Sequence, residues 1–147
     1  MKDGTITVTG CDRVRGMYDI TYNGTVTEGY TKDKDEYRNL KIIRLLYGVG
    51  IQVTSIGFYY FYAAIQICME DRLASTNAQK NIYMVIAEHY NVSYKSVERA
   101  IRVAFPESVS MRASRLFENE MKIFTFQKND EITPLEFISL AALVVSA

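Results

Sequence analysis

Four charged side chains lie three and four residues apart within one short segment, and their types suit base recognition. They are Lys95, Glu98, Arg99 and Arg102. On a helix, residues at this spacing share one face. Arginine is shaped for a bidentate contact with guanine O6 and N7, and a glutamate can accept a hydrogen bond from the cytosine amino group. The pattern therefore predicts that these four side chains contact DNA bases from a helix over residues 93–105 in the major groove.

The same segment has an apolar face that would dock such a helix on a protein core. Val97, Ala100, Ile101, Ala104 and Phe105 recur at three- and four-residue steps. A second helical pattern ends at Tyr90, a short turn follows in which we expect Val92 to face inward, and Ser93 is a typical N-cap. An amphipathic helix alone is common in globular proteins, but helix, tight turn and capped helix together predict a helix-turn-helix.

Five further side chains are candidates for phosphate contacts. Backbone N–H groups and hydroxyls in the first turn of a helix bind phosphate oxygens, and arginine does so from any neighbouring element. The candidates for DNA phosphate contact are Ser93, Tyr94, Ser96, Arg112 and Arg115.

The sequence offers little for catalysis or metal binding. His89 is the single histidine, and Cys11 and Cys68 lie in different segments, so these residues do not make a zinc set. Nucleophile-elbow, P-loop and dinucleotide-binding motifs are absent from the sequence. We therefore expect a protein that is not an enzyme, with no catalytic residue, cofactor or metal.

Composition indicates one soluble globular unit. The chain has 147 residues, and its 17 basic residues equal its 17 acidic ones. This balance excludes a polycationic nucleic-acid coat but permits a local basic surface. No apolar stretch reaches the roughly 20 residues that span a bilayer, and the first ten residues lack the apolar core of a signal peptide. We expect a cytoplasmic protein with reduced thiols and no membrane contact.

Two types of periodicity divide the chain. Residues 5–9 and 18–28 alternate at period two, and Asn23-Gly24 is a strong hairpin signal, so we predict an antiparallel β-hairpin module over residues 1–31. A charged connector over residues 32–35 leads to a helical domain, residues 32–147, with Thr133-Pro134 opening its last helix. The predicted fold class is α+β: a small β-hairpin module followed by a mainly helical domain containing the helix-turn-helix.

The segment from Gly57 to Arg102 resembles a known family. Gly57-Phe58-Tyr59-Tyr60-Phe61, Ile86-Ala87 with Tyr90-Asn91, and above all Val97-Glu98-Arg99-Ala100-Ile101-Arg102 are similar to the C-terminal effector domain of the stage-zero sporulation response regulator of endospore-forming bacteria. The likeness extends over about residues 45–144.

The resemblance implies a helical DNA-binding domain that regulates transcription and often binds tandem sites head to tail. It places Glu98, Arg99 and Arg102 on DNA-contacting positions of the recognition helix. Residues 1–44 are too short for a receiver domain and lack its alternating βα pattern, so control by phosphorylation is not implied.

Two alternatives use the same fold differently. The helical domain could serve a phage or mobile element as an anti-defence inhibitor, for example of anti-CRISPR type, that binds a host protein such as a nuclease. The zero net charge favours this alternative, and so does Ser96, which stands where the family usually has arginine. A homodimer assembled through the hairpin edge is the third hypothesis and is compatible with either function. Binding to random duplex DNA discriminates the first hypothesis from the second.

Overall fold

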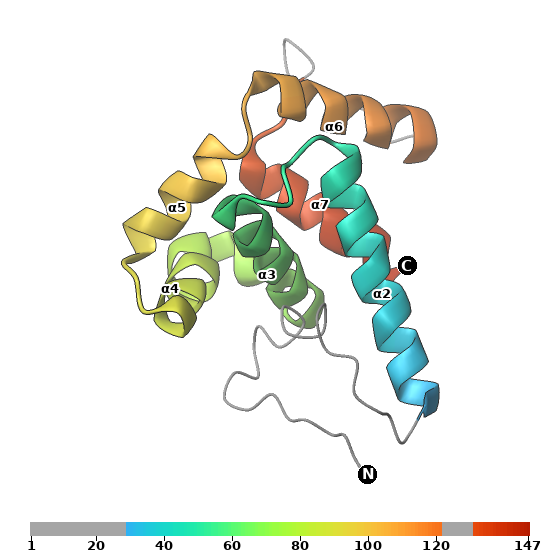
Figure 1. Ribbon diagram of the computed structural model, residues 1–147, viewed down its shortest axis with the longest axis horizontal. Coiled ribbons are helices and arrows are strands. Elements are labelled where there is room, and N and C mark those ends of the chain that lie inside the picture. Colours follow the sequence, from blue (N-terminus) through green and yellow to red (C-terminus); the bar gives the residue numbers. More distant parts are fainter. Residues whose placement is uncertain (1–28, 122–130) are drawn as a thin grey trace.

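The computed structural model describes residues 29–121 and 131–147, and the regular elements in these ranges are all helical (Figure 1). In chain order they are α2 (Gly29–Gly48), α3 (Ile56–Glu70), a 3-10 turn η1 (Ala74–Asn77), a π-helical turn η2 (Gln79–Tyr83), α4 (Met84–Tyr90), α5 (Tyr94–Val103), α6 (Glu107–Met121) and α7 (Pro134–Ser146).

The predicted α+β class is wrong, because the described residues are helical throughout and contain no strand. Gly29, Tyr30 and Thr31, which we assigned to the β-hairpin module, form the first turn of α2. The charged segment 32–35 is not a connector but continues the same helix. Lysine is a good helix former, and although aspartate is not, α2 carries the buried positions Asn39, Ile42 and Leu46 after this segment. The predicted strands and the Asn23-Gly24 turn lie outside the described residues.

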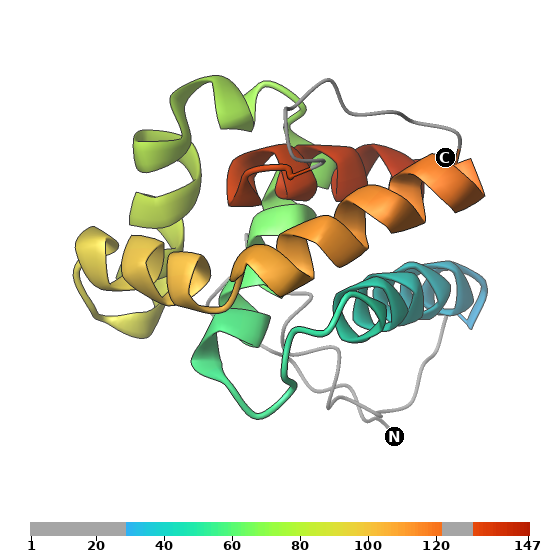
Figure 2. The same cartoon turned by 90° about the horizontal axis from the view of Figure 1, so that it is seen from above.

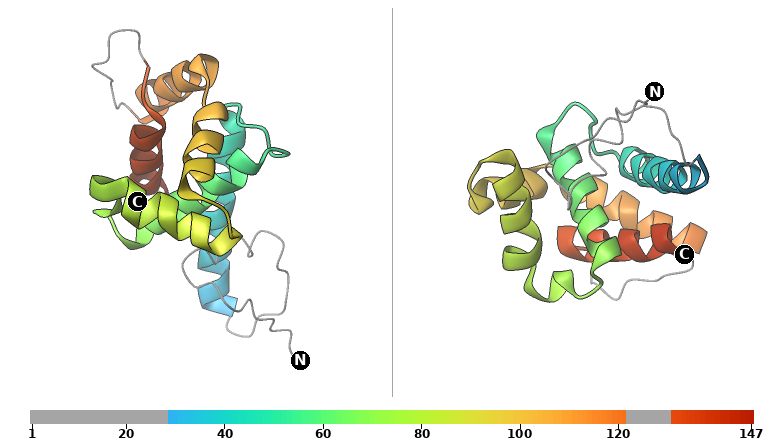
Figure 3. Two further views of the ribbon diagram at one scale, coloured as in Figure 1. Left: turned by 90° about the vertical axis from the view of Figure 1, so that its left-hand side faces the viewer. Right: turned by 90° about the horizontal axis from the view of Figure 1, so that it is seen from below.

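Helix α3 is the centre of the fold. Its residues 60–65 are all buried, and the helix contacts α2, α5 and α7. Figures 2 and 3 show α4 and α5 on one side of α3 and α2 on the other. The apolar character of α3 around its whole circumference thus corresponds to its central place.

Four phenylalanine rings join the helices around α3. The Phe137 ring of α7 lies 5.8 Å from Phe61 of α3, 5.3 Å from Phe105 after α5 and 5.9 Å from Phe117 of α6, measured between ring centroids. Phe61 also lies 5.5 Å from Phe105. Aromatic pairs at these separations add to the burial of their large apolar surfaces. This aromatic cluster holds α5, α6 and α7 on α3.

Helix ends follow the expected capping chemistry. The Thr133 hydroxyl accepts a hydrogen bond from the Glu136 N–H at 3.1 Å, and a Glu136 carboxylate oxygen accepts one from the Thr133 N–H at 2.8 Å. With Pro134 in the first turn this is a complete capping box.

Among the described helices none is long and apolar enough to cross a membrane.

The crossing of α3 and α5 depends on Gly57. A Cβ atom at this position would lie 2.6 Å from the Ala104 Cβ and 2.8 Å from the Ala100 carbonyl oxygen. We therefore expect Gly57→Ala to push α5 from α3 and to lower the free energy of unfolding by about 1–3 kcal/mol in urea denaturation. Gly48→Ala is the control, because a Cβ atom at Gly48 meets nothing within 4 Å. Equal stabilities of the two variants would contradict the close crossing.

Candidate nucleic-acid interface

A turn of three residues joins α4 to α5. Asn91 adopts a left-handed conformation, with φ 57°, and its N–H donates to the Glu88 carbonyl oxygen at 3.3 Å. The Val92 N–H donates to the Ala87 carbonyl oxygen at 3.0 Å. Asparagine tolerates this backbone region better than most residues, which explains its place at the end of α4.

The turn departs from the prediction at Val92. We expected this side chain to face inward, but it is 41% exposed. The turn is fixed by the two backbone hydrogen bonds to α4 carbonyls, so it needs no apolar anchor.

Ser93 caps the second helix as predicted. Its hydroxyl oxygen accepts a hydrogen bond from the Ser96 N–H at 3.1 Å, and the two serine hydroxyls lie 2.9 Å apart. Both serines are exposed, whereas Tyr94 is partly buried and packs against the core. The capped first turn of α5 therefore presents the hydroxyls of Ser93 and Ser96 to solvent.

Helix α5 has the two faces that its sequence predicts. Val97, Ile101 and Phe105 are buried, and the four charged side chains predicted to contact bases are all exposed. Because successive residues of a helix turn by about 100°, Lys95 and Arg99 lie nearly opposite the buried face. These two side chains point furthest from the core.

Glu98 and Arg102 lie on the flank of α5 that faces α7. With Tyr83 of η2 and residues 133–135 at the start of α7 they border a small cavity of about 200 Å³. The pKa of the Tyr83 hydroxyl is raised by burial and, to a smaller extent, by the negative charge of Glu98. Of the predicted base contacts, Glu98 and Arg102 therefore border this cavity, whereas Lys95 and Arg99 do not.

The cationic groups of α5 are available to a ligand. Within the ranges that the structure describes, no hydrogen bond or ion pair engages the side chain of Lys95, Arg99 or Arg102. A charged side chain without an internal partner keeps its full capacity for a charge-assisted hydrogen bond. The outward face of α5 is therefore suited to bind an anion.

The two arginines predicted to contact phosphate lie on α6, apart from the α5 set. The Arg112 guanidinium donates to the Val49 carbonyl oxygen at 3.4 Å and lies beside Gly50, whose φ is 97°. Arg115 is exposed one turn further along. Arg112 thus ties α6 to the turn between α2 and α3, a role that the sequence did not reveal.

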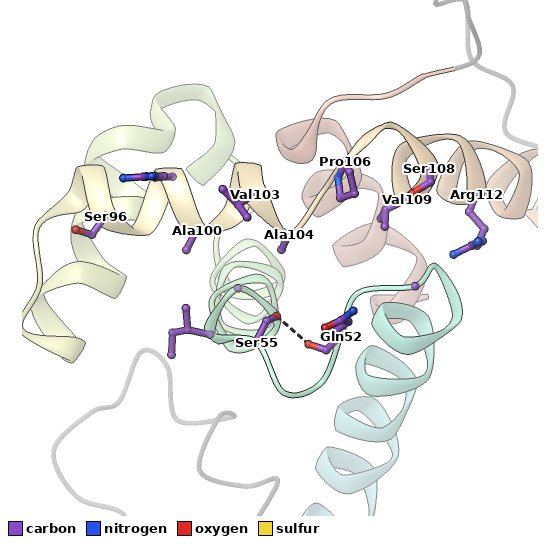
Figure 4. A pocket seen from close by; sticks show the side chains of 14 residues that line it. Gln52, Ser55, Ser96, Ala100, Val103, Ala104, Pro106, Ser108, Val109 and Arg112 are labelled. Carbon is purple, nitrogen blue, oxygen red and sulfur yellow. Dashed lines mark hydrogen bonds between the residues drawn. The ribbon is translucent and has the colours of Figure 1, made fainter.

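A groove beside α5 was not predicted. It has a volume of about 720 Å³ and lies between α5, the start of α3 and the first turns of α6 (Figure 4). Among the described residues that line it, Arg99 and Arg112 carry a charge. The groove is lined by three segments, from α5, α6 and the region around the start of α3, so no local sequence pattern could predict it.

The remaining reactive side chains are built into the packing. The Cys68 thiol is buried, and burial together with the charge of Asp71 raises its pKa to about 11. Burial lowers the pKa of His89, whose ring stands edge-on to Tyr90 at 4.9 Å. Across the described part of the chain, no three histidine, cysteine, aspartate or glutamate side chains are placed to hold a metal ion. Cys11 lies outside the described residues.

The chain matches the model of one protein family over most of its length. The family model described as "Sporulation initiation factor Spo0A C terminal" matches residues 42–144, which is more than two thirds of the sequence. The chain belongs to this family. The family is a helical DNA-binding domain of a transcription regulator. No curated protein and no solved structure matched the chain.

The Spo0A C-terminal domain, as matched here, begins inside α2 and ends inside α7. It therefore includes the aromatic cluster, the α4–α5 pair and all nine side chains predicted to contact DNA. The resemblance drawn from the Val97–Arg102 segment is confirmed. The first turns of α2, before residue 42, precede the match.

Proposed function

We propose that α4 and α5 form a helix-turn-helix that binds double-stranded DNA sequence-specifically and regulates transcription. The recognition segment, about residues 93–105 with α5 at its centre, enters the major groove. The observation that carries this proposal is the outward face of α5, where Lys95 and Arg99 point away from the buried side without an internal partner. Membership of a DNA-binding family supports it.

The position of each side chain around α5 suggests its part. Arg99 is the central base contact, since it lies nearly opposite the core, and a guanine is the base that its guanidinium fits best. Lys95 lies beside it, one turn towards the start of the helix. Glu98 and Arg102 contact bases at the edge of the site nearest α7.

The phosphate contacts would flank this base-contacting surface. The exposed N-terminal turn of α5 offers the hydroxyls of Ser93 and Ser96, and Tyr94 can contribute its hydroxyl from a partly buried ring. On α6, Arg112 and Arg115 supply positive charge to the DNA backbone on the other side of the major groove. These contacts fix the position of α5 on the duplex and carry no sequence information themselves.

Arg99→Ala tests the proposal directly. Selection from a pool of random duplexes should enrich a short motif, and the variant should bind that motif more weakly by about 1–3 kcal/mol and lose preference at one base pair. Fluorescence anisotropy at two salt concentrations measures both effects. Arg115→Ala should instead weaken all sequences alike and reduce the salt slope by about 1.

Arg72→Ala is the matched control, because Arg72 is also an exposed arginine but lies beyond the end of α3. Its loss removes the same charge and should leave the base preference unchanged. If Arg99→Ala and Arg72→Ala bind the enriched duplex equally well, Arg99 does not contact a base. If no motif is enriched and no duplex binds at low salt, the proposal fails, and a protein target becomes the subject of the next search.

A further inference from the structure

The groove beside α5 is large enough to hold a small molecule. Its volume of about 720 Å³ falls within the range of roughly 300–1,000 Å³ that is typical of ligand pockets. Figure 4 shows Ala100 and Ala104 of α5 on one side and Gln52 and Ser55, before α3, on the other. Gly57, Ala100 and Ala104 are small, so they allow α3 and α5 to approach closely at the floor of the groove. Their short side chains also fill little of the space above that floor.

Apolar side chains at the rim of the groove are unusually exposed. Val103 is 69% exposed and Ile56 is 50% exposed, and both line the groove with Pro106 and Val109. A flat apolar body bound here would remove these side chains from water. Removing apolar surface from water favours binding in proportion to the area buried.

The charge in the groove has one sign. Arg99 lies on α5, Arg112 lies towards the end near α2, and none of the described residues that line the groove is acidic. The other polar groups are the Gln52 amide and three serine side chains, Ser55, Ser96 and Ser108. Guanidinium groups are donors only, so they favour carboxylate, sulfonate or phosphate oxygens.

We propose that this groove binds a small organic anion with a flat apolar body. The anionic group is held by the Arg99 guanidinium, and the apolar body lies over Ala100 and Ala104 against Val103 and Ile56. Carboxylate, sulfonate and phosphate share the required chemistry.

Such a ligand would regulate DNA binding through a shared side chain. Arg99 lines the groove and is also the central base contact, so this step rests on the proposed function. An anion paired with the Arg99 guanidinium occupies the donors that guanine requires. Ligand and DNA therefore compete, and the ligand acts as an inhibitor of DNA binding.

The direct test uses 8-anilinonaphthalene-1-sulfonate, a fluorescent anion with a flat apolar body, titrated into the full chain without DNA. We expect saturable one-to-one binding. Val103→Asp, which places a carboxylate in the groove at an exposed position, should weaken binding at least tenfold. Val103→Asn introduces a side chain of nearly the same shape as aspartate but without its charge, and it should change the affinity for the dye less than threefold.

Leu73→Asp provides the matched control. Leu73 is 70% exposed, as Val103 is 69% exposed, but it lies outside the groove. If the dye binds Val103→Asp and Leu73→Asp equally well, or binds with no defined stoichiometry, it lies elsewhere and the proposal is overturned. The probes terephthalate and adenosine 5′-monophosphate, added as competitors, then compare carboxylate with phosphate as the preferred anion.

A second measurement adds the enriched duplex. Saturating dye should weaken duplex binding to the unmodified chain at least fivefold and should have little effect on Val103→Asp. If the dye binds in the groove but no duplex is enriched, the proposed function fails while the site stands. If the dye does not bind and Val103→Asn weakens the duplex tenfold, DNA itself occupies the groove and the ligand proposal is overturned.

Discussion

Phe137→Ala is expected to lower the free energy of unfolding by about 3–5 kcal/mol, the typical cost of removing a buried phenylalanine ring. The side chain is fully buried, and its ring contacts Phe61, Phe105 and Phe117. These neighbours belong to α3, to the turn after α5 and to α6. Truncation to alanine leaves a cavity where four segments meet. The other three segments cannot close this cavity without moving relative to α3.

Urea denaturation followed by far-ultraviolet circular dichroism measures this loss. Phe137→Leu keeps most of the volume and should cost less than Phe137→Ala, because the remaining cavity is smaller. Leu143→Ala lies on the same helix at a half-exposed position and should change stability by well under half as much. If Phe137→Ala and Leu143→Ala were equally stable, α7 would not be part of the core.

Helices with a strong apolar period could be predicted from the sequence. The α5 pattern of Val97, Ile101 and Phe105 corresponds to its buried face, and the Thr133-Pro134 start corresponds to the capping box of α7. Both depend on residues close in sequence, whose spacing fixes which side faces the core. The same locality explains why the family could be recognised from the Val97–Arg102 segment.

The start of α2 could not be predicted in this way. Residues 29–36 have no apolar period of their own, and the tyrosine and threonine at 30 and 31 favour a strand by composition. Their helical state continues from the part of α2 in which Ile42 and Leu46 pack on the core. Tertiary packing here overrides a weak local preference.

The geometry of the candidate interface could not be predicted from the sequence, because it depends on how α5 packs on the rest of the fold. Spacing alone put four charged side chains on one face, but the packing around α5 gives them different surroundings: Arg99 lines the groove, whereas Glu98 and Arg102 border the small cavity near α7. The groove likewise depends on the close approach at Gly57, which brings the start of α3 beside α5. These are long-range relations, and a periodic pattern holds no information about them.

Ser110→Ala is expected to lower the free energy of unfolding by about 2–4 kcal/mol, although it removes a single oxygen atom. The Ser110 hydroxyl donates to the Ile132 carbonyl oxygen at 2.7 Å and accepts from the Ile132 N–H at 2.8 Å. Both residues are buried. Alanine would leave a backbone donor and a backbone acceptor without these bonds away from water, and each such group costs about 1–3 kcal/mol.

Hydrogen exchange of the Ile132 amide separates this effect from a general loss of packing. The amide should exchange faster in Ser110→Ala, while the amides of α3 keep their relative order of protection. Ser108→Ala is the matched control, because Ser108 is an exposed serine on the same helix, and its loss should change stability by about 0.5 kcal/mol or less. Because Ser110 and Phe137 both hold α7 against α6, their double substitution should cost less than the sum of the two single ones. Full additivity would mean that the start of α7 and its aromatic anchor detach independently.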